Sequence, residues 1–313
     1  MKNFAKLIKL TLLVATSTVM FSCSDDDNAA PESNTIAAIA SRNPNFTTLV
    51  AALDRAGLVQ TLDQNGPFTV FAPTNAAFND FLADNGFTSL NDIPVDVLRE
   101  VLLNHVVNGT NLSTSLSTGY VKTLGKGSAS DSNTLSMFIN TASGVRLNGV
   151  ASVTTADIVA SNGVIHVVDA VIGLPTVVTH AAANPGFSTL VSLLTQQNLV
   201  STLDGTASSP FTVFAPNNDA FTTFETQNPG VLAGLTSAQV TAVLTYHVVA
   251  GANVLSTGIP ATPITTFETG TFTIAGTTIT DESDRQTGII ATDVQASNGV
   301  IHVVNNVLLP TFD

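Results

Sequence analysis

The chain has 313 residues, of which 44% are hydrophobic and only 11% charged, and its formal net charge is −13. A surface this acidic repels nucleic acid and anionic lipid headgroups, which excludes both as direct partners. It suits a cationic partner or divalent ions, although the simpler interpretation is that acidity keeps a secreted protein soluble. The single cysteine excludes an internal disulfide.

The first 22 residues have the pattern of an export signal. Three lysines, at positions 2, 6 and 9, precede an apolar stretch over Leu10–Phe21 that is too short to span a membrane as a mature helix. Small Ser22 and then Cys23 follow, and the segment resembles the lipobox of bacterial lipoproteins, although Met20 and Phe21 depart from its commonest form. The resemblance implies lipidation at Cys23; the alternative is an ordinary secretory signal with an incidental cysteine.

Residues 23–33 are expected to form an acidic tether. After Cys23 and Ser24 come three aspartates, Asp25–Asp27, and this segment resembles the acidic export signal of surface lipoproteins of the Bacteroidetes. The alternative is a spacer without signal content. Loss of residues 1–22 removes three lysines and no acid, leaving 7 basic and 23 acidic residues. The expected product is exported, lipid-anchored in the outer membrane and displayed at the cell surface, with the lipid as its only membrane contact.

The remainder of the chain is one domain duplicated. The eight residues Ser161–Val168 recur without change as Ser297–Val304, and ahead of each copy the block Pro67–Pro73 recurs as Pro210–Pro216. These matches predict two domains, over residues 34–175 and 176–313. Each has about 140 residues, which is enough for a hydrophobic core of its own.

Helical patterns recur in both copies. Apolar residues at helical spacing predict a first helix from Phe46 to Leu53, and Thr74 or Asn75 is expected to cap a second. A third helix is predicted to end near His105 in the first copy. In the second copy it ends near His247. There, Thr236 and Gln239 have the spacing of a capping box.

The other segments are predicted to form strands and turns. The block Phe68–Pro73 is β-branched and aromatic, which predicts a short strand ended by proline. The last strands, predicted over Gly163–Ile172 and Gly299–Leu309, are almost continuously apolar and should be covered on both faces. Gly125–Gly127 lacks the context of a phosphate-binding loop and reads as a hairpin turn.

These blocks resemble the two signatures of the fasciclin-domain family. Thr69–Phe78 is similar to the first, Asn162–Asp169 to the second, and Tyr246-His247 to a Tyr-His pair between them, where the first copy has Asn104 instead. The resemblance covers both copies. It implies an α+β fold, with a β-sandwich or wedge flanked by short helices in each domain, and a function in adhesion rather than catalysis.

The resemblance also implies candidate contact positions. In some animal members of the family, an Asp-Ile pair before the second signature and the Tyr-His region are contact sites. Carried over residue by residue, the first position holds Asp157 and Ile158 in one copy and Asp293 and Val294, a partial match, in the other. The second position holds Tyr246 and His247.

Four histidines are expected to be structural. His105 and His247 lie on apolar helix faces, and His166 and His302 lie in apolar strands, where a neutral imidazole donates from one nitrogen and accepts at the other. The sequence offers too few further ligands near them for a metal site, so neither a metal nor a cofactor is expected. The acidic run Asp281–Asp284 reads as a solvated turn; weak calcium binding is the alternative.

The sequence therefore favours a non-enzymatic, envelope-anchored protein that mediates attachment between cells or to matrix or surface polysaccharide. Its partner would be a protein or a polysaccharide, and its oligomeric state is not indicated. The sequence is also compatible with two other functions. One is an envelope enzyme or accessory protein acting on a polymer, and the other is a scaffold with no ligand of its own.

Overall fold

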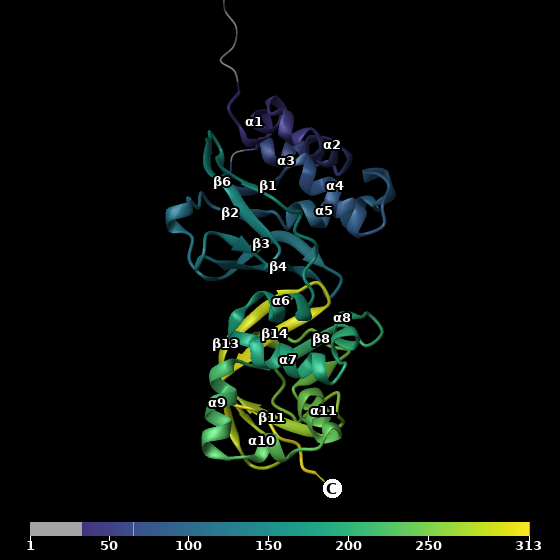
Figure 1. Ribbon diagram of the computed structural model, residues 1–313, viewed down its shortest axis with the longest axis vertical. Helices are drawn as coiled ribbons and strands as arrows, with labels where there is room; N and C mark the ends of the chain where they lie inside the picture. The colour runs from purple at the N-terminus through teal and green to yellow at the C-terminus, as the bar shows by residue number, and fades with distance from the viewer. Residues whose placement is uncertain (1–32, 65, 313) are drawn as a thin grey trace, which may run out of the picture. The chain divides into compact units, whose positions relative to one another are not determined.

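The computed structural model describes residues 33–64 and 66–312 (Figure 1). The first copy contains five α-helices and three short 3-10 helices within these residues. They are α1 (Ile36–Arg42), η1 (Pro44–Phe46), α2 (Thr47–Arg55), α3 (Val59–Asp63), α4 (Asn75–Asp84), η2 (Leu90–Asp92), α5 (Val95–Leu103) and η3 (Ser113–Ser115). Its strands are β1 (Phe68–Pro73), β2 (Val106–Asn108), β3 (Gly119–Gly127), β4 (Ser130–Asn140), β5 (Arg146–Leu147), β6 (Ala151–Ala160) and β7 (Gly163–Val168).

The second copy repeats this order. Its helices are α6 (Val177–Ala183), η4 (Pro185–Phe187), α7 (Ser188–Gln196), α8 (Val200–Asp204), α9 (Asn218–Gln227), α10 (Val231–Gly234), α11 (Ser237–Tyr246) and η5 (Ser256–Gly258). Its strands are β8 (Phe211–Pro216), β9 (Val248–Ala250), β10 (Ile264–Thr265), β11 (Thr271–Ala275), β12 (Thr278–Thr280), β13 (Gln286–Ala296) and β14 (Gly299–Val304). The mixed α+β content predicted from the sequence is confirmed.

Helix starts follow from local sequence. Thr74 accepts a hydrogen bond from the N–H of Ala77 and so caps α4. Thr236 and Gln239 form the expected capping box at the start of α11. The predicted first helix is divided, because Phe46 closes η1 and α2 begins at Thr47. Helix α1, which lies ahead of it, was not predicted.

The strands of the first copy form a closed barrel, and those of the second form an open seven-stranded sheet in the order β10-β11-β12-β13-β14-β8-β9. In both copies the last strand pairs in parallel with the first, β7 with β1 and β14 with β8. Because β7 also pairs with β6 and β14 with β13, the strand that carries the repeated octapeptide is paired on both edges in each domain. Figure 1 shows helices α1 to α5 gathered beside the strands of the first copy.

Side chains of β7 alternate between two cores. Ile165 packs with the helices, in a cluster that includes Phe46, Phe78 and Leu98, whereas Val168 faces a second cluster around Met137. The prediction that this strand is covered on both faces is confirmed. It ends earlier than predicted, at Val168 rather than Ile172, and the buried residues beyond it lie in irregular backbone.

Glycine at the start of β7 allows the close approach of β1. A Cβ atom on Gly163 would lie 1.9 Å from the carbonyl oxygen of Phe68, and its φ is +151°. A Cβ on the equivalent Gly299 would lie 2.3 Å from the carbonyl oxygen of Phe211. The repeated glycine is thus required by strand packing.

The turn predicted at Gly125–Gly127 is displaced. All three residues belong to β3, and the chain turns at the following two residues. The reason is contact with α5: a Cβ on Gly125 would lie 2.7 Å from the backbone nitrogen of Asn104, and Lys126 N donates to Glu100 Oε2 at 2.6 Å. Glycine here lets the strand pass close to the helix.

Candidate functional site

Asp157 and Asp293 occupy matching bends in β6 and β13. Each has φ of +63°, a left-handed conformation that few residues other than glycine adopt. The pairing with β7 shifts register between Thr155 and Ile158, and the pairing of β13 with β14 shifts likewise before Val294. These are β-bulges, which redirect a side chain out of the regular alternation.

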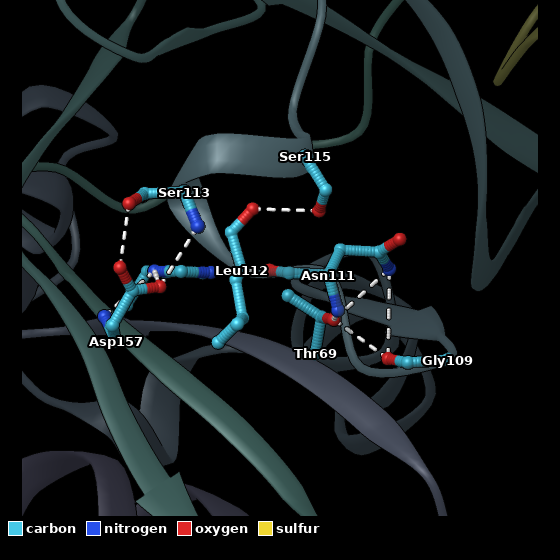
Figure 2. A network of polar contacts seen from close by, with 8 residues as sticks. Thr69, Gly109, Asn111, Leu112, Ser113, Ser115 and Asp157 are labelled. Carbon is cyan, nitrogen blue, oxygen red and sulfur yellow. Dashed lines mark hydrogen bonds and ion pairs between the residues drawn. The ribbon is translucent and has the colours of Figure 1, made fainter.

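The redirected carboxylate of Asp157 caps η3 (Figure 2). Its Oδ1 accepts a hydrogen bond from Ser113 N at 2.8 Å, and its Oδ2 accepts one from Ser113 Oγ at 2.5 Å. Asp293 holds Ser256, the first residue of η5, through bonds of the same lengths. Both carboxylates are therefore already engaged inside their own domain.

These bonds also set the acidity of the two aspartates. Donation from the hydroxyl and N–H of Ser113 lowers the pKa of Asp157. For Asp293, burial raises the pKa, but the hydrogen bonds from Ser256 outweigh it, and the pKa is again lowered. Both groups are ionised near neutral pH.

A histidine lies beneath each bend. Asp157 N donates to His166 Nδ1 at 3.2 Å, and His166 Nε2 lies 2.9 Å from Asn111 O. The imidazole therefore accepts at Nδ1 and donates at Nε2, and its ring stacks on Phe71 with centroids 5.4 Å apart. The second copy differs: His302 Nε2 contacts Val254 O at 2.9 Å, while its buried Nδ1 has no hydrogen-bond partner. Burial lowers the pKa of His302.

The loop ahead of η3 is held by a second polar network (Figure 2). Thr69 Oγ1 donates to Gly109 O at 2.6 Å and accepts from Asn111 N at 2.8 Å and from Asn111 Nδ2 at 3.0 Å. Thr212 makes the corresponding main-chain bonds in the second copy, where Val254 replaces Asn111 and supplies no amide. In the second copy, Asn253 of the same loop instead exchanges hydrogen bonds with the buried side chain of Gln295.

Two apolar side chains next to the Asp157 bend are exposed, and their counterparts in the second copy, Leu255 and Gln295, are not. Leu112, beside Ser113, is 40% exposed, and Val159, two residues after Asp157, is 67% exposed. Thr110 and Val159 line one shallow depression of about 320 Å³, so the loop and the strand adjoin. In the second copy Gln295 takes the place of Val159 and is buried. Leu112 and Val159 are not predictable as contact residues from the sequence, because exposure depends on long-range packing.

The remaining predicted contact residues lie inside the domains. Ile158 is half-buried against the helical core, and Val294 is buried. Tyr246 is fully buried: its Oη donates to Thr271 O at 2.5 Å and accepts from Glu282 N at 3.1 Å, and burial raises its pKa. His247 is also buried. A partner docking on the folded domain would not touch Tyr246 or His247.

His105 and His247 hold the same position in the two copies. Nδ1 of each lies 2.7 Å from the carbonyl oxygen four residues earlier, Val101 or Val243. Nε2 of each accepts a main-chain N–H at 2.9 Å, from Ile172 or Leu308. Burial lowers the pKa of both to about 4, so both imidazoles are neutral.

The acidic run Asp281–Asp284 faces backbone amides. Asp281 is buried, and its carboxylate accepts hydrogen bonds from the N–H groups of Ser283, Arg285 and Leu309. Glu282 accepts from Thr271 N and Thr311 N. Across residues 33–64 and 66–312, no group of three or more His, Cys, Asp or Glu side chains has a metal-binding arrangement.

The fasciclin-domain family model matches residues 44–175 and again residues 185–310, so it covers both copies. The chain belongs to the fasciclin-domain family. Its two matches stand in tandem, each with mixed α and β structure.

Relatives of this fasciclin-domain protein include bacterial and animal chains. Protein sll1483 of Synechocystis sp. is 40% identical over 144 residues, which cover 46% of this chain and 76% of that one. Human periostin is 28% identical over 277 residues, covering 84% of this chain but only 31% of periostin. Among solved structures, a domain pair from the insect cell adhesion molecule Fasciclin I shares 21% identity with a TM-score of 0.48, covering 83% of this chain and 92% of that one.

Among residues 33–64 and 66–312, no helix is both long enough and apolar enough to cross a membrane. Cys23, the predicted signal and the predicted tether up to residue 32 lie outside the described residues. Their roles remain predictions from sequence.

Proposed function

We propose that this protein is an exported, envelope-anchored adhesion protein that attaches the cell to a protein or polysaccharide on another cell, in matrix or on a surface. Membership of the fasciclin-domain family supports adhesion, and a solved relative is described as a cell adhesion molecule. The role proposed is binding without catalysis.

The observation that carries the proposal is the exposed apolar surface beside the Asp157 bend. Exposed single apolar residues are common, but Leu112 and Val159 adjoin a loop and a bulge that hydrogen bonds hold in place. A surface fixed in advance loses less conformational freedom when a partner binds. We therefore place the contact surface, defined as Leu112, Val159 and the Asp157 bend, in the first copy.

In this proposal some of the predicted contact residues shape the two bends, and the others stabilise the fold. Asp157 and Ile158 shape the contact surface, the first by capping η3 and the second by anchoring the strand to the core. Asp293 and Val294 shape the corresponding bend of the second copy. Tyr246 and His247 are buried, and their hydrogen bonds stabilise the second copy, which carries that bend.

Anchoring at Cys23 completes the proposal. A lipid on this residue would attach the chain to the outer membrane, and the acidic tether would place the two domains at the cell surface. Two linked domains also raise avidity where both engage partners together, since the second binding event becomes intramolecular.

Two experiments on the source bacterium test the proposal. Metabolic labelling with palmitate, followed by protease treatment of intact cells, is expected to label the chain and then to degrade it; a Cys23→Ser variant should lose the label. A deletion strain is expected to lose aggregation or surface attachment. Unchanged attachment, aggregation and biofilm formation in that strain would contradict the adhesion function.

A further inference from the structure

The helical side of the second copy forms a cavity of about 720 Å³ that is open to solvent. Its walls come from α7, α9, α10 and α11, and the buried end of the wall includes Val243, Leu244 and His247. Pockets for small molecules in proteins span roughly 300–1,000 Å³. The cavity therefore has the size of a small-molecule site, and it shares no residue with the contact surface.

The corresponding part of the first copy is filled. Leu98 and Ile93, the counterparts of Val240 and Leu235, are 0% and 2% exposed, whereas Val240 and Leu235 remain partly exposed and line the cavity. The two copies thus differ in how completely side chains fill this region.

Sequence differences between the copies explain the opening. Phe87 packs on the core of the first copy, and the matching segment of the second, residues 228–236, has no aromatic residue. Leu82 also packs there, and its counterpart on α9 is Glu225. Leu98 is matched by the smaller Val240. Each change removes apolar volume from the same region.

The polar groups in the cavity wall already have partners within the protein. Asn218 Oδ1 accepts from Thr189 N, and its Nδ2 donates to Pro185 O. The hydroxyls of Thr222 and Thr226 donate to carbonyl oxygens of their own helix. His247 uses both ring nitrogens on main-chain groups. A ligand therefore gains mainly from contact with apolar walls such as Phe221, Leu232 and Val240.

The charge of the wall disfavours an anionic ligand. Glu225 is the only charged residue among those that line the cavity, and its Oε1 accepts a hydrogen bond from Gly230 N at 2.6 Å. No lysine or arginine lines it. An anion would be desolvated against apolar walls and repelled by this carboxylate.

We propose that the cavity of the second copy binds an uncharged, hydrocarbon-rich small molecule. The family's tandem repeat then combines two functions: the first copy presents an adhesive surface, and the second carries a ligand. The apolar walls supply the binding free energy, and Glu225 sets the preference against anions.

The test uses two fluorescent probes of the same ring system on the purified chain. N-phenyl-1-naphthylamine is neutral, and 8-anilinonaphthalene-1-sulfonate carries a sulfonate. The neutral probe is expected to bind saturably, with one site per chain, and the anionic probe at least about tenfold more weakly. No saturable binding of the neutral probe, or tighter binding of the sulfonate, would overturn the proposal.

Variants locate the site. Val240→Phe fills the cavity, and Thr226→Phe blocks it from the exposed side of α9; both are expected to abolish binding of the neutral probe. Thr223→Phe is the matched control, because Thr223 is exposed on the same helix and does not line the cavity. Circular dichroism and thermal unfolding establish that each variant folds. Undiminished binding in a folded Thr226→Phe protein would overturn the proposal even where Val240→Phe fails to fold.

Discussion

The Nε2 atom of His105 accepts a hydrogen bond from the main-chain N–H of Ile172 at 2.9 Å. The histidine follows α5, and Ile172 lies in the irregular segment after the last strand of the same domain, so the bond joins two distant parts of the chain. His247 and Leu308 repeat it in the second copy. Because a protonated imidazole has no acceptor, both bonds require neutral histidine.

Stability is expected to fall as the pH is lowered from about 6.5 to about 4. Burial lowers the pKa of His105, His180 and His247 to about 4, against 6.5 in the unfolded chain. Between these values the unfolded state binds more protons, so protonation favours unfolding. The maximum loss is on the order of 3 kcal/mol for each histidine. Urea unfolding at a series of pH values measures it, and a free energy of unfolding that stays constant across this range would contradict the assignment.

Replacing His105 by alanine should destabilise the first copy by roughly 3 kcal/mol, because the Ile172 N–H is left buried without an acceptor and the ring leaves a void. The same variant should weaken the pH dependence between about 6.5 and 4. Urea unfolding at two pH values measures both effects. His247→Ala is the matched variant in the second copy, and wild-type stability in either protein would show that the bond is not needed.

Asp157 should tolerate glycine better than alanine. Alanine removes the cap on Ser113, worth about 1 kcal/mol, and also retains a Cβ at φ of +63°. Glycine loses the cap but relieves the backbone strain. We therefore expect Asp157→Gly to be more stable than Asp157→Ala, with wild type the most stable of the three. Thermal unfolding ranks them, and the reverse order for glycine and alanine would contradict the strained geometry.

Gly163→Ala should prevent folding of the first copy or destabilise it by at least about 3 kcal/mol, since the added Cβ would overlap the carbonyl oxygen of Phe68. Gly258→Ala is the control, because nothing lies within 4 Å of a Cβ there and its φ is not left-handed. Expression level and thermal unfolding compare the two. Equal stability would mean that the two strands need no glycine between them.

Local sequence was sufficient for several elements. A block of β-branched and aromatic residues ended by proline, present in both copies, correctly predicted β1 and β8, and Thr74, Thr236 and Gln239 correctly predicted helix starts. Helix α1 escaped prediction because it has only seven residues, four of which are alanine or serine. Short segments of this kind owe their helicity to packing.

The candidate site was harder to predict because its geometry depends on distant residues. The bend at Asp157 follows from a register shift between β6 and β7, which the sequence of β6 alone does not encode. The hydroxyl of Tyr246 binds Thr271, 25 residues further along the chain. The cavity of the second copy arises where the ring of Phe87 has no counterpart, and missing volume leaves no motif in a sequence.

The most direct measurement of the adhesive role is attachment of the deletion strain carrying variants of the contact surface. Leu112→Asp combined with Val159→Asp places two charges on that surface without altering a buried residue. Val150→Asp is the control, because Val150 is 51% exposed in the same domain, outside the contact surface. Equal surface display is checked with an antibody. We predict that wild type and Val150→Asp restore attachment and that the double variant does not; full restoration by the double variant would contradict an adhesive role for the contact surface.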